Sequence, residues 1–337
     1  MKGLMGRVLL GVAAGVAIYV GVSIWANARE VGQALARFYW PAALAAAALA
    51  AGNYGLRWVR WEFYLRRLKI RISTADSVLV FLAGFALTVT PGKLGEAVKA
   101  LLLRQSHGIP AARTAPIVIA ERITDLIALL LLALVGVFTF ELDRRFLAAG
   151  AAAVAITLLV IGSETLSERI LGTLERVKRL ARFVPKLREF HAATALLLRP
   201  VPLLITTLLS AGSWFLECLA FWLVVRGFPG AQLGVQAATF IYAAMTVAGA
   251  LSFLPGGLGL TEAGMLALLT TFGSGIPRGT AAAATFVTRA CTLWFAVAIG
   301  VAALMLYARR TGTKVPAVGA LENGGTAEAA ASPATPP

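Results

Sequence analysis

The 337-residue chain has few charged residues and almost no cysteine or histidine. Only 14% of its residues are charged, against roughly 25% in soluble domains. The composition is instead 59% hydrophobic, with a mean hydropathy of +0.80. A helix needs about 20 apolar residues to cross a bilayer, and several apolar blocks reach that length. We therefore expect an all-α, polytopic integral membrane protein without a soluble enzyme domain.

Residues for metal, redox or nucleotide chemistry are scarce. Cys218 and Cys291 lie in apolar stretches without C-x-x-C spacing, which is typical of small core residues. His107 and His191 stand alone, so a Ser/His/Asp constellation requires a site on the cytoplasmic side. The sequence has no ATP-binding loop of the G-x-x-x-x-G-K-[ST] type. We expect no metal and no cofactor.

The net charge of +15 is spread over short segments between the apolar blocks, which favours a membrane topology over a nucleic-acid partner. With a cytoplasmic N-terminus, the outside segments hold six Lys and Arg and the inside segments hold 22 of the 31. The inside segments are 1–7, 57–76, 97–114, 163–200 and 308–337. This bias predicts a multi-pass protein of the cytoplasmic (inner) membrane, with both termini in the cytoplasm.

Six apolar blocks are uninterrupted and predict full transmembrane helices: 7–26, 38–56, 115–140, 146–162, 201–225 and 279–307. The block 7–26 is interpreted as a retained span rather than a signal peptide. Two further blocks, 77–103 and 236–272, are interrupted by proline and glycine. Unpaired backbone groups at such breaks cannot face lipid, so we expect re-entrant hairpins. Two complete spans per block are the alternative, because they leave the same charge bias.

The two breaks contain similar residues: Pro91, Gly92 and Gly95 in the first, and Pro255, Gly256, Gly257 and Gly259 in the second. A Gly-Ile-Pro segment follows each break, and an arginine lies twelve residues past its proline. These recurrences predict two repeats, 38–140 and 201–307, that cross the membrane in opposite directions. Inverted repeats with broken helices are a recurring design of secondary transporters. A duplication kept only for packing is the alternative.

Seven charged residues lie in or beside the apolar blocks and are the candidate substrate-binding or gating residues: Lys93, Glu96, Arg122, Asp125, Glu217, Glu262 and Arg289. A charge at the membrane centre costs about 2.5–3.5 kcal/mol, so such residues usually pair and serve function. Both glutamates that follow a break are expected to pair with the arginines across the repeat interface. A salt bridge that only fixes helix register is the alternative. Asn53 and Glu217 occupy matching places in the two repeats.

Two segments lie outside the apolar blocks. The segment 163–200 mixes apolar and basic residues, which predicts either amphipathic helices on the inner leaflet or a solvated connector. The tail 311–337 is rich in Ala, Gly and Pro, and we expect it to be disordered. The single transmembrane domain is thus expected to span 1–310.

Four motifs carry a resemblance to a known family: Leu56-Arg57-Trp58-x-x-Trp61, Pro91–Glu96, Glu121-Arg122-x-x-Asp125 and Pro255–Glu262. The chain resembles the lysylphosphatidylglycerol synthase transmembrane region family over about residues 5–310. In bifunctional members this region is held to flip an aminoacylated phospholipid that a separate C-terminal domain makes. We expect no synthase domain here, because about 30 residues follow the last span.

The resemblance implies a lipid flippase or transporter, not an enzyme, with a membrane lipid as its substrate. A membrane enzyme or accessory subunit of glycolipid or hopanoid synthesis is the alternative. In the flippase, Lys93, Arg122 and Arg289 bind phosphate, and Glu96 and Glu262 pair with them or with protons. Lys93 stands where an arginine is commoner in the family. A homo-oligomer and a lipid-synthesis enzyme stay open as protein partners.

The inside assignment of 163–200 is testable by labelling. In a background without Cys218 and Cys291, a cysteine at Arg179 should react with an impermeant maleimide only after the cells are permeabilised. A cysteine at Arg37, which belongs to an outside segment, should react in intact cells. Labelling of position 179 in intact cells contradicts the topology.

Overall fold

The computed structural model describes residues 2–89, 95–140, 145–162, 168–169, 172–173, 175, 184–252 and 254–312. Secondary structure in these ranges is helical, and the one β-type contact is an isolated bridge between Gln232 and Ser274. The all-α prediction is therefore confirmed. The predicted first break at 90–94, most of the connector and the tail 313–337 lie outside the described residues.

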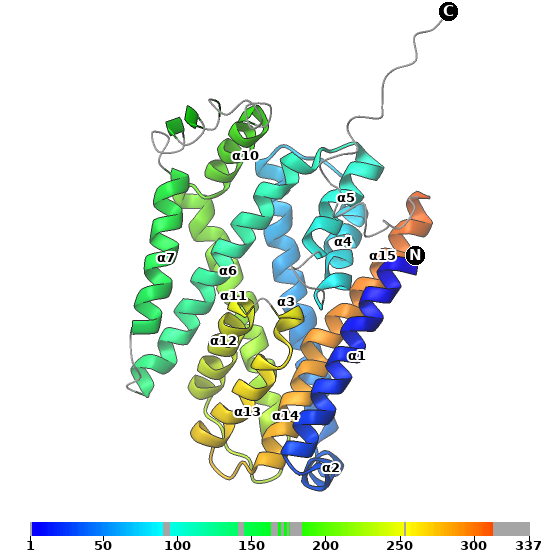
Figure 1. Cartoon of the computed structure of the whole chain (residues 1–337), viewed down its shortest axis with the longest axis vertical. Coiled ribbons are helices and arrows are strands. Elements are labelled where there is room, and N and C mark those ends of the chain that lie inside the picture. The colour runs from blue at the N-terminus through cyan, green and yellow to red at the C-terminus, as the bar shows by residue number, and fades with distance from the viewer. Residues whose placement is uncertain are drawn as a thin grey trace, which may run out of the picture.

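The helices follow one another in this order (Figure 1): α1 Lys2–Trp25, α2 Ala28–Ala36, α3 Trp40–Arg67, α4 Thr74–Ala83, α5 Gly95–His107, α6 Ala111–Thr139, α7 Arg145–Gly162, α10 Val184–Leu197, α11 Pro200–Arg226, α12 Val235–Leu251, α13 Leu260–Phe272, α14 Arg278–Arg289 and α15 Phe295–Thr311. Short 3₁₀ turns cover η1 Gly84–Leu87 and η3 Pro255–Gly257. A π-helical turn, η4 Ala290–Trp294, joins α14 to α15.

Two helices of the described chain are long and apolar enough to cross a membrane by themselves, α11 and the continuous helix Arg278–Thr311. A third is added if α2 and α3, which meet at an 88° bend, count as one span. A membrane-embedded, polytopic protein agrees with these helices. The topology of six full spans stays a prediction.

Helix α3 continues beyond the predicted end of its span at residue 56 and reaches Arg67. The apolar pattern ends at Arg57, but arginine and glutamate are good helix formers and do not stop a helix. Trp61, Tyr64 and Leu65 are buried in this extension, which holds it against the rest of the bundle. The extension therefore carries charged residues into the interior that the sequence placed in a cytoplasmic segment.

The centre of the bundle is the pair α3 and α11, which pack together more extensively than any other two described helices. Helix α6 packs against α12 and α11, while α15 packs against α4 and η1. In Figure 1, α4 and α5 occupy the upper part of the molecule, and α12 and α13 occupy the lower part. The two interrupted segments thus extend toward the middle from opposite ends.

Each end of the bundle has its own apolar core. One core gathers around α4 and α5, and the other around α12 and α13. Their buried members include Trp61, Leu87, Leu102 and Tyr307 in the first, and Phe221, Ile241 and Leu266 in the second. Large apolar side chains also cover the outside of the bundle, where Leu44, Leu159, Leu208 and Leu251 are more than 60% exposed. Such a surface suits lipid tails rather than water.

The second break needs glycine. Gly256, Gly257 and Gly259 have φ values of 60°, 68° and 91°, which side chains rarely adopt. A Cβ at Gly257 would lie 2.7 Å from Thr261 Oγ1 and 3.1 Å from Gly249 Cα. Gly257 therefore packs directly against the backbone of α12 and the Thr261 side chain of α13, where a larger residue would clash.

We expect Gly257→Ala to lower the free energy of unfolding by about 1–3 kcal/mol, because it adds a strained φ and a steric clash. Thermal unfolding of the purified protein in detergent measures the loss. Gly32→Ala is the control, since nothing lies within 4 Å of a Cβ there and alanine favours the helix. Equal stability of both variants contradicts the close backbone contact.

Candidate functional site

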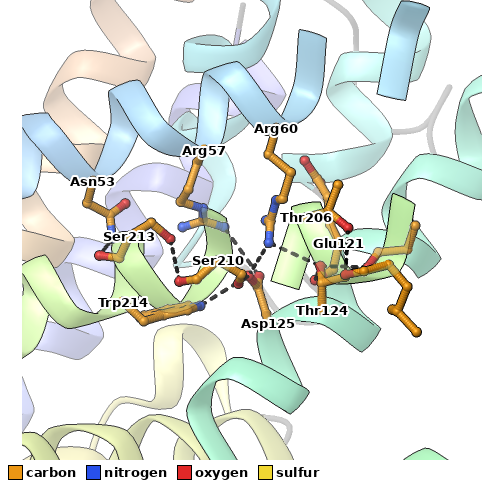
Figure 2. Close-up of polar contacts among 12 residues, drawn as sticks. Asn53, Arg57, Arg60, Glu121, Thr124, Asp125, Thr206, Ser210, Ser213 and Trp214 are labelled. Atoms are coloured by element: carbon orange, nitrogen blue, oxygen red, sulfur yellow. Dashed lines mark hydrogen bonds and ion pairs between the residues drawn. The ribbon is translucent and has the colours of Figure 1, made fainter. Parts of the chain in front are cut away.

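A buried carboxylate joins three helices at the middle of the bundle (Figure 2). Asp125 Oδ1, on α6, lies 2.6 Å from Arg60 Nη1 on α3. From α11, Ser210 Oγ donates to the same oxygen at 2.6 Å and Trp214 Nε1 donates at 3.1 Å. Arg57 Nη2 lies 3.7 Å from Asp125 Oδ2. We call these residues, together with Arg122, the Asp125 cluster.

The Asp125 cluster holds more positive than negative charge. Arg57, Arg60 and Arg122 all act electrostatically on the Asp125 carboxylate. Arg57 and Arg60 both lie within ion-pair distance of this one carboxylate, so their pairing with it leaves one positive charge in excess. A surplus of this kind inside an apolar bundle is costly, because buried charges need partners.

A neighbouring ion pair does not remove that excess. Lys99 Nζ, on α5, lies 2.8 Å from Glu121 Oε2 on α6, and both side chains are under 10% exposed. The ammonium also lies 4.6 Å from the centroid of the Trp61 ring, a cation–π geometry. This pair is neutral in sum, so the positive surplus stays with the Asp125 cluster.

Two arginines of the cluster, Arg57 and Arg60, have hydrogen-bond donors that are not used within the described structure. Arg60 is 1% exposed, yet its Nε and Nη2 find no hydrogen-bond acceptor among the described residues. Arg57 Nε is also buried and finds no acceptor in that part of the chain. Guanidinium has five N–H donors, and buried donors are normally satisfied. The cluster therefore has both the charge and the free donors to bind an oxyanion.

Of Arg57 and Arg60, Arg57 has the more exposed side chain. Its side chain is 17% exposed, compared with 1% for Arg60. The guanidinium lies 5.4 Å from the Trp214 ring and 5.7 Å from the Phe85 ring. Aromatic rings hold a planar guanidinium in place while leaving its N–H edges available.

A second charged group fixes the break between α12 and α13. Arg289 Nε lies 2.7 Å from Glu262 Oε1, and Arg289 Nη2 donates to Gly256 O at 2.6 Å. Glu262 Oε2 accepts the N–H of Gly259 at 2.6 Å. The predicted pairing of Glu262 with a buried arginine is therefore confirmed, but its partner Arg289 belongs to the same half of the chain and not to the other repeat. The break and α14 are joined by α13, which packs on α14, so Glu262 and Arg289 lie close together.

Glu217 is buried in α11 and accepts a hydrogen bond from Tyr242 Oη at 2.6 Å. The matching polar residue in the first half, Asn53, donates to Ser213 O at 2.9 Å. Both face the seam between α3, α11 and α12, but they do not contact each other directly. Asn53 therefore makes a polar contact across the two halves, whereas the contact of Glu217 with Tyr242 lies within the second half.

The other predicted site residues fall at the first break. Pro91, Gly92 and Lys93 lie outside the described residues. Gly95 begins α5, and Glu96 lies in its first turn, where its side chain is outside the described part. The predicted pairing of Glu96 with an arginine thus stays a prediction.

Arg57, Arg60, Lys99 and Glu121 belong to the charged interior but were not predicted as site residues. Arg57, Arg60 and Lys99 fall in segments that positive charge assigned to the cytoplasm, whereas Glu121 lies in the predicted span 115–140. A signal was present in the spacing, since Arg57, Arg60 and Tyr64 lie on one face of a helix at i, i+3 and i+7. The same helix face buries Tyr64 and Arg60.

A serine, a histidine and an aspartate do meet near the end of α5. His107 Nδ1 lies 2.8 Å from Ser106 Oγ, and His107 Nε2 lies 3.5 Å from Asp76 Oδ2. Ser106 Oγ also donates to Leu102 O at 2.7 Å and contacts Tyr307 Oη, so these polar contacts join the end of α5 to α15. In the described residues, no group of three His, Cys, Asp or Glu is placed to hold a metal ion.

We expect Asp125→Ala to lower the free energy of unfolding by about 3–5 kcal/mol, because buried guanidinium groups lose their counter-charge. Adding Arg60→Met should restore part of the loss. Thermal unfolding in detergent measures both. Arg66→Gln on the same helix should change little, since the Arg66 side chain is 82% exposed. A loss no larger than that of the Arg66 variant excludes a neutralising role for Asp125.

The chain matches the family model of the lysylphosphatidylglycerol synthase TM region over residues 12–300. Two relatives from Methanothermobacter thermautotrophicus, both named UPF0104 membrane protein, are 27% and 25% identical to it over 282 and 308 residues. These alignments cover 76% and 86% of this chain, and 82% and 90% of the two relatives. Since the family match spans most of the sequence, the chain belongs to the lysylphosphatidylglycerol synthase transmembrane-region family of membrane proteins.

Proposed function

We propose that this protein is a lipid flippase or transporter, which moves a phospholipid or lipid-linked polar head group across the cytoplasmic membrane. The observation that carries the proposal is the positive surplus of the Asp125 cluster. Arg57 and Arg60 share one carboxylate there, and both have N–H donors that find no acceptor in the described part of the chain. A phosphate group supplies the missing negative charge and the missing acceptors.

Guanidinium groups suit this ligand because they bind phosphate through parallel hydrogen bonds. The acyl chains of the lipid stay in the bilayer, while the head group passes between the helices that carry the cluster. The described structure encloses Arg60, Asp125 and Ser210, which are all under 5% exposed. Transport therefore requires α3, α6 and α11 to separate.

The packing of the bundle supports an inverted repeat that moves in this way. The last helix of each half packs on the interrupted segment of the other, α6 on α12 and α15 on α4. The interrupted segments extend inward from opposite ends of the molecule (Figure 1). Rocking of one repeat against the other gives alternating access in transporters of this design. Both termini are assigned to the cytoplasm by the distribution of basic residues.

The role of Arg289 differs from the one that the sequence suggested. Its guanidinium is engaged by Glu262 and by the carbonyl of Gly256. We therefore assign Arg289 to positioning the second break, and assign phosphate binding to Arg57, Arg60 and Arg122. The drive is a lipid gradient, an ion gradient or the membrane potential, since the sequence shows no ATP-binding loop.

Arg57→Gln should slow head-group translocation by roughly 10- to 100-fold, since a hydrogen bond to a charged group contributes about 1.5–3 kcal/mol. The assay uses liposomes with a fluorescent phosphatidylglycerol and a membrane-impermeant quencher. Arg57→Lys should be intermediate, because lysine keeps the charge but not the parallel donors. Arg66→Gln, on the same helix but exposed, should match the unmodified protein.

Full-rate translocation by a folded Arg57→Gln variant contradicts the proposed binding site. Translocation no faster than in protein-free liposomes contradicts the flippase proposal altogether. Chromatography of the recovered lipid tests the alternative: a chemically altered lipid favours a membrane enzyme of glycolipid or hopanoid synthesis.

A further inference from the structure

Glu217 differs from the other buried acids of the described chain in its partners. Glu121, Asp125 and Glu262 each lie within ion-pair distance of a lysine or arginine. Glu217 is 5% exposed, and within the described ranges no cation lies within ion-pair distance of it. Its recorded contact is the hydrogen bond from Tyr242 Oη on α12. One neutral donor is little compensation for an ionised carboxylate in an apolar bundle.

The cations that act on Glu217 do so from a distance and from both charged centres. Arg57 of the Asp125 cluster and Arg289 of the second break both interact with it electrostatically. Glu217 thus lies between the two groups and changes the balance of charge at each. Taking up a proton at Glu217 leaves both arginines with less negative charge near them.

Every helix that packs on α11 near Glu217 brings titratable or charged groups of its own. Helix α3 brings Tyr54 and Arg57, and α12 brings Tyr242. Helix α14 brings Arg289, η4 brings Cys291, and α6 brings Asp125. The tyrosines and the cysteine are neutral at ordinary pH. The arginines stay charged throughout, and Asp125 is ion-paired. Glu217 is therefore the one acid in this set that has no ion-pair partner among the described residues.

The helix opposite Glu217 is irregular where it passes the carboxylate. Ala290–Trp294 forms a π-helical turn directly after Arg289. Tyr54 Oη donates to Thr292 O in this turn at 2.9 Å. Glu217 acts electrostatically on Tyr54 and on Cys291, so the π turn lies beside it. Single π turns in α-helices occur frequently at functional sites.

We propose that Glu217 is a proton-binding site that couples proton movement to head-group transport, an inference that rests on the proposed function. A proton from the aqueous phase forms an O–H bond with the carboxylate when an anionic head group enters beside Arg57. The uptake makes the interior one charge more positive, so proton and anion each favour the binding of the other. Reorientation carries both, and the proton leaves as the head group is released.

The proposed ratio of one proton to one head group fixes how strongly a pH gradient shifts the lipid between leaflets. One proton that accompanies one monoanionic head group moves no net charge, so the membrane potential does not affect the distribution. A gradient of one pH unit corresponds to about 1.36 kcal/mol, which shifts the leaflet distribution about tenfold. The lipid is expected to accumulate in the leaflet on the alkaline side.

The test uses the full chain in liposomes that contain fluorescent phosphatidylglycerol, with the membrane potential clamped by potassium and valinomycin. The leaflet distribution is measured by impermeant quenching, with and without a gradient of one pH unit. The unmodified protein should shift the distribution about tenfold. Glu217→Gln should still equilibrate the lipid between leaflets without any shift by the gradient. Glu189→Gln, which removes an exposed acid, should behave like the unmodified protein.

A second variant keeps the Glu217 carboxylate, so it tests the proposal even if Glu217→Gln does not fold. Tyr242→Phe removes the hydrogen bond that stabilises the ionised carboxylate, so the proton should bind more readily. The pH at which lipid-dependent proton uptake is half-maximal should therefore rise, as measured with a pH dye trapped inside the liposomes. An unchanged half-maximal pH contradicts the assignment.

Two outcomes separate this inference from the proposed function. Equilibration of the lipid by the unmodified protein with no response to the pH gradient overturns the proton site and leaves the flippase intact. An unchanged pH-driven shift in folded Glu217→Gln also overturns the proton site. Failure of the unmodified protein to equilibrate any lipid overturns the flippase, and the proton coupling with it.

Discussion

The hydrogen-bonded ion pair between Arg60 and Asp125 is the contact that most of the interior depends on. It lies where α3, α6 and α11 meet, and Ser210 and Trp214 complete the coordination of the carboxylate. Charges in the bilayer centre are tolerated only with partners of this kind. Because Arg57 also lies within ion-pair distance of Asp125, this one carboxylate balances only part of the positive charge. The remaining positive charge is the basis of the proposed anion site.

At the break between α12 and α13, a second buried ion pair satisfies backbone groups that the turn leaves without helical partners. Glycines turn the backbone sharply there, which leaves N–H and C=O groups that lipid cannot satisfy. Glu262 accepts the N–H of Gly259, and Arg289 donates to the carbonyl of Gly256. The ion pair between the two side chains then holds the break against α14. This centre is internally balanced, whereas the Asp125 cluster is not, and Glu217 lies between them.

The features that depend on local composition were predictable from the sequence. The apolar blocks at 201–225 and 279–307 correspond to α11 and to the helix Arg278–Thr311, and Pro255 marks the second break. Glu262 and Arg289 stand out because each is a charge within an apolar block. A charged residue at the end of a block gives no such signal.

The features that depend on tertiary contacts were not predictable in the same way. Arg57 and Arg60 follow the last apolar residues of their block, so the pattern assigned them to the cytoplasm. Packing of Trp61 and Tyr64 continues the helix inward and buries Arg60 beside Asp125. Glu262 pairs with Arg289 within one half and not across the repeat interface, because sequence spacing does not say which helices the fold brings together. Pairing is a property of the packed helices rather than of either segment.

The most direct test of the phosphate site is an experimental structure of the protein in a lipid nanodisc that contains phosphatidylglycerol. The charge surplus predicts a lipid phosphate within hydrogen-bond distance of Arg57 and Arg60, in at least one conformation. The same phosphate should be missing from Arg57→Gln. A head group bound elsewhere, with the cluster closed in every conformation, contradicts the central claim.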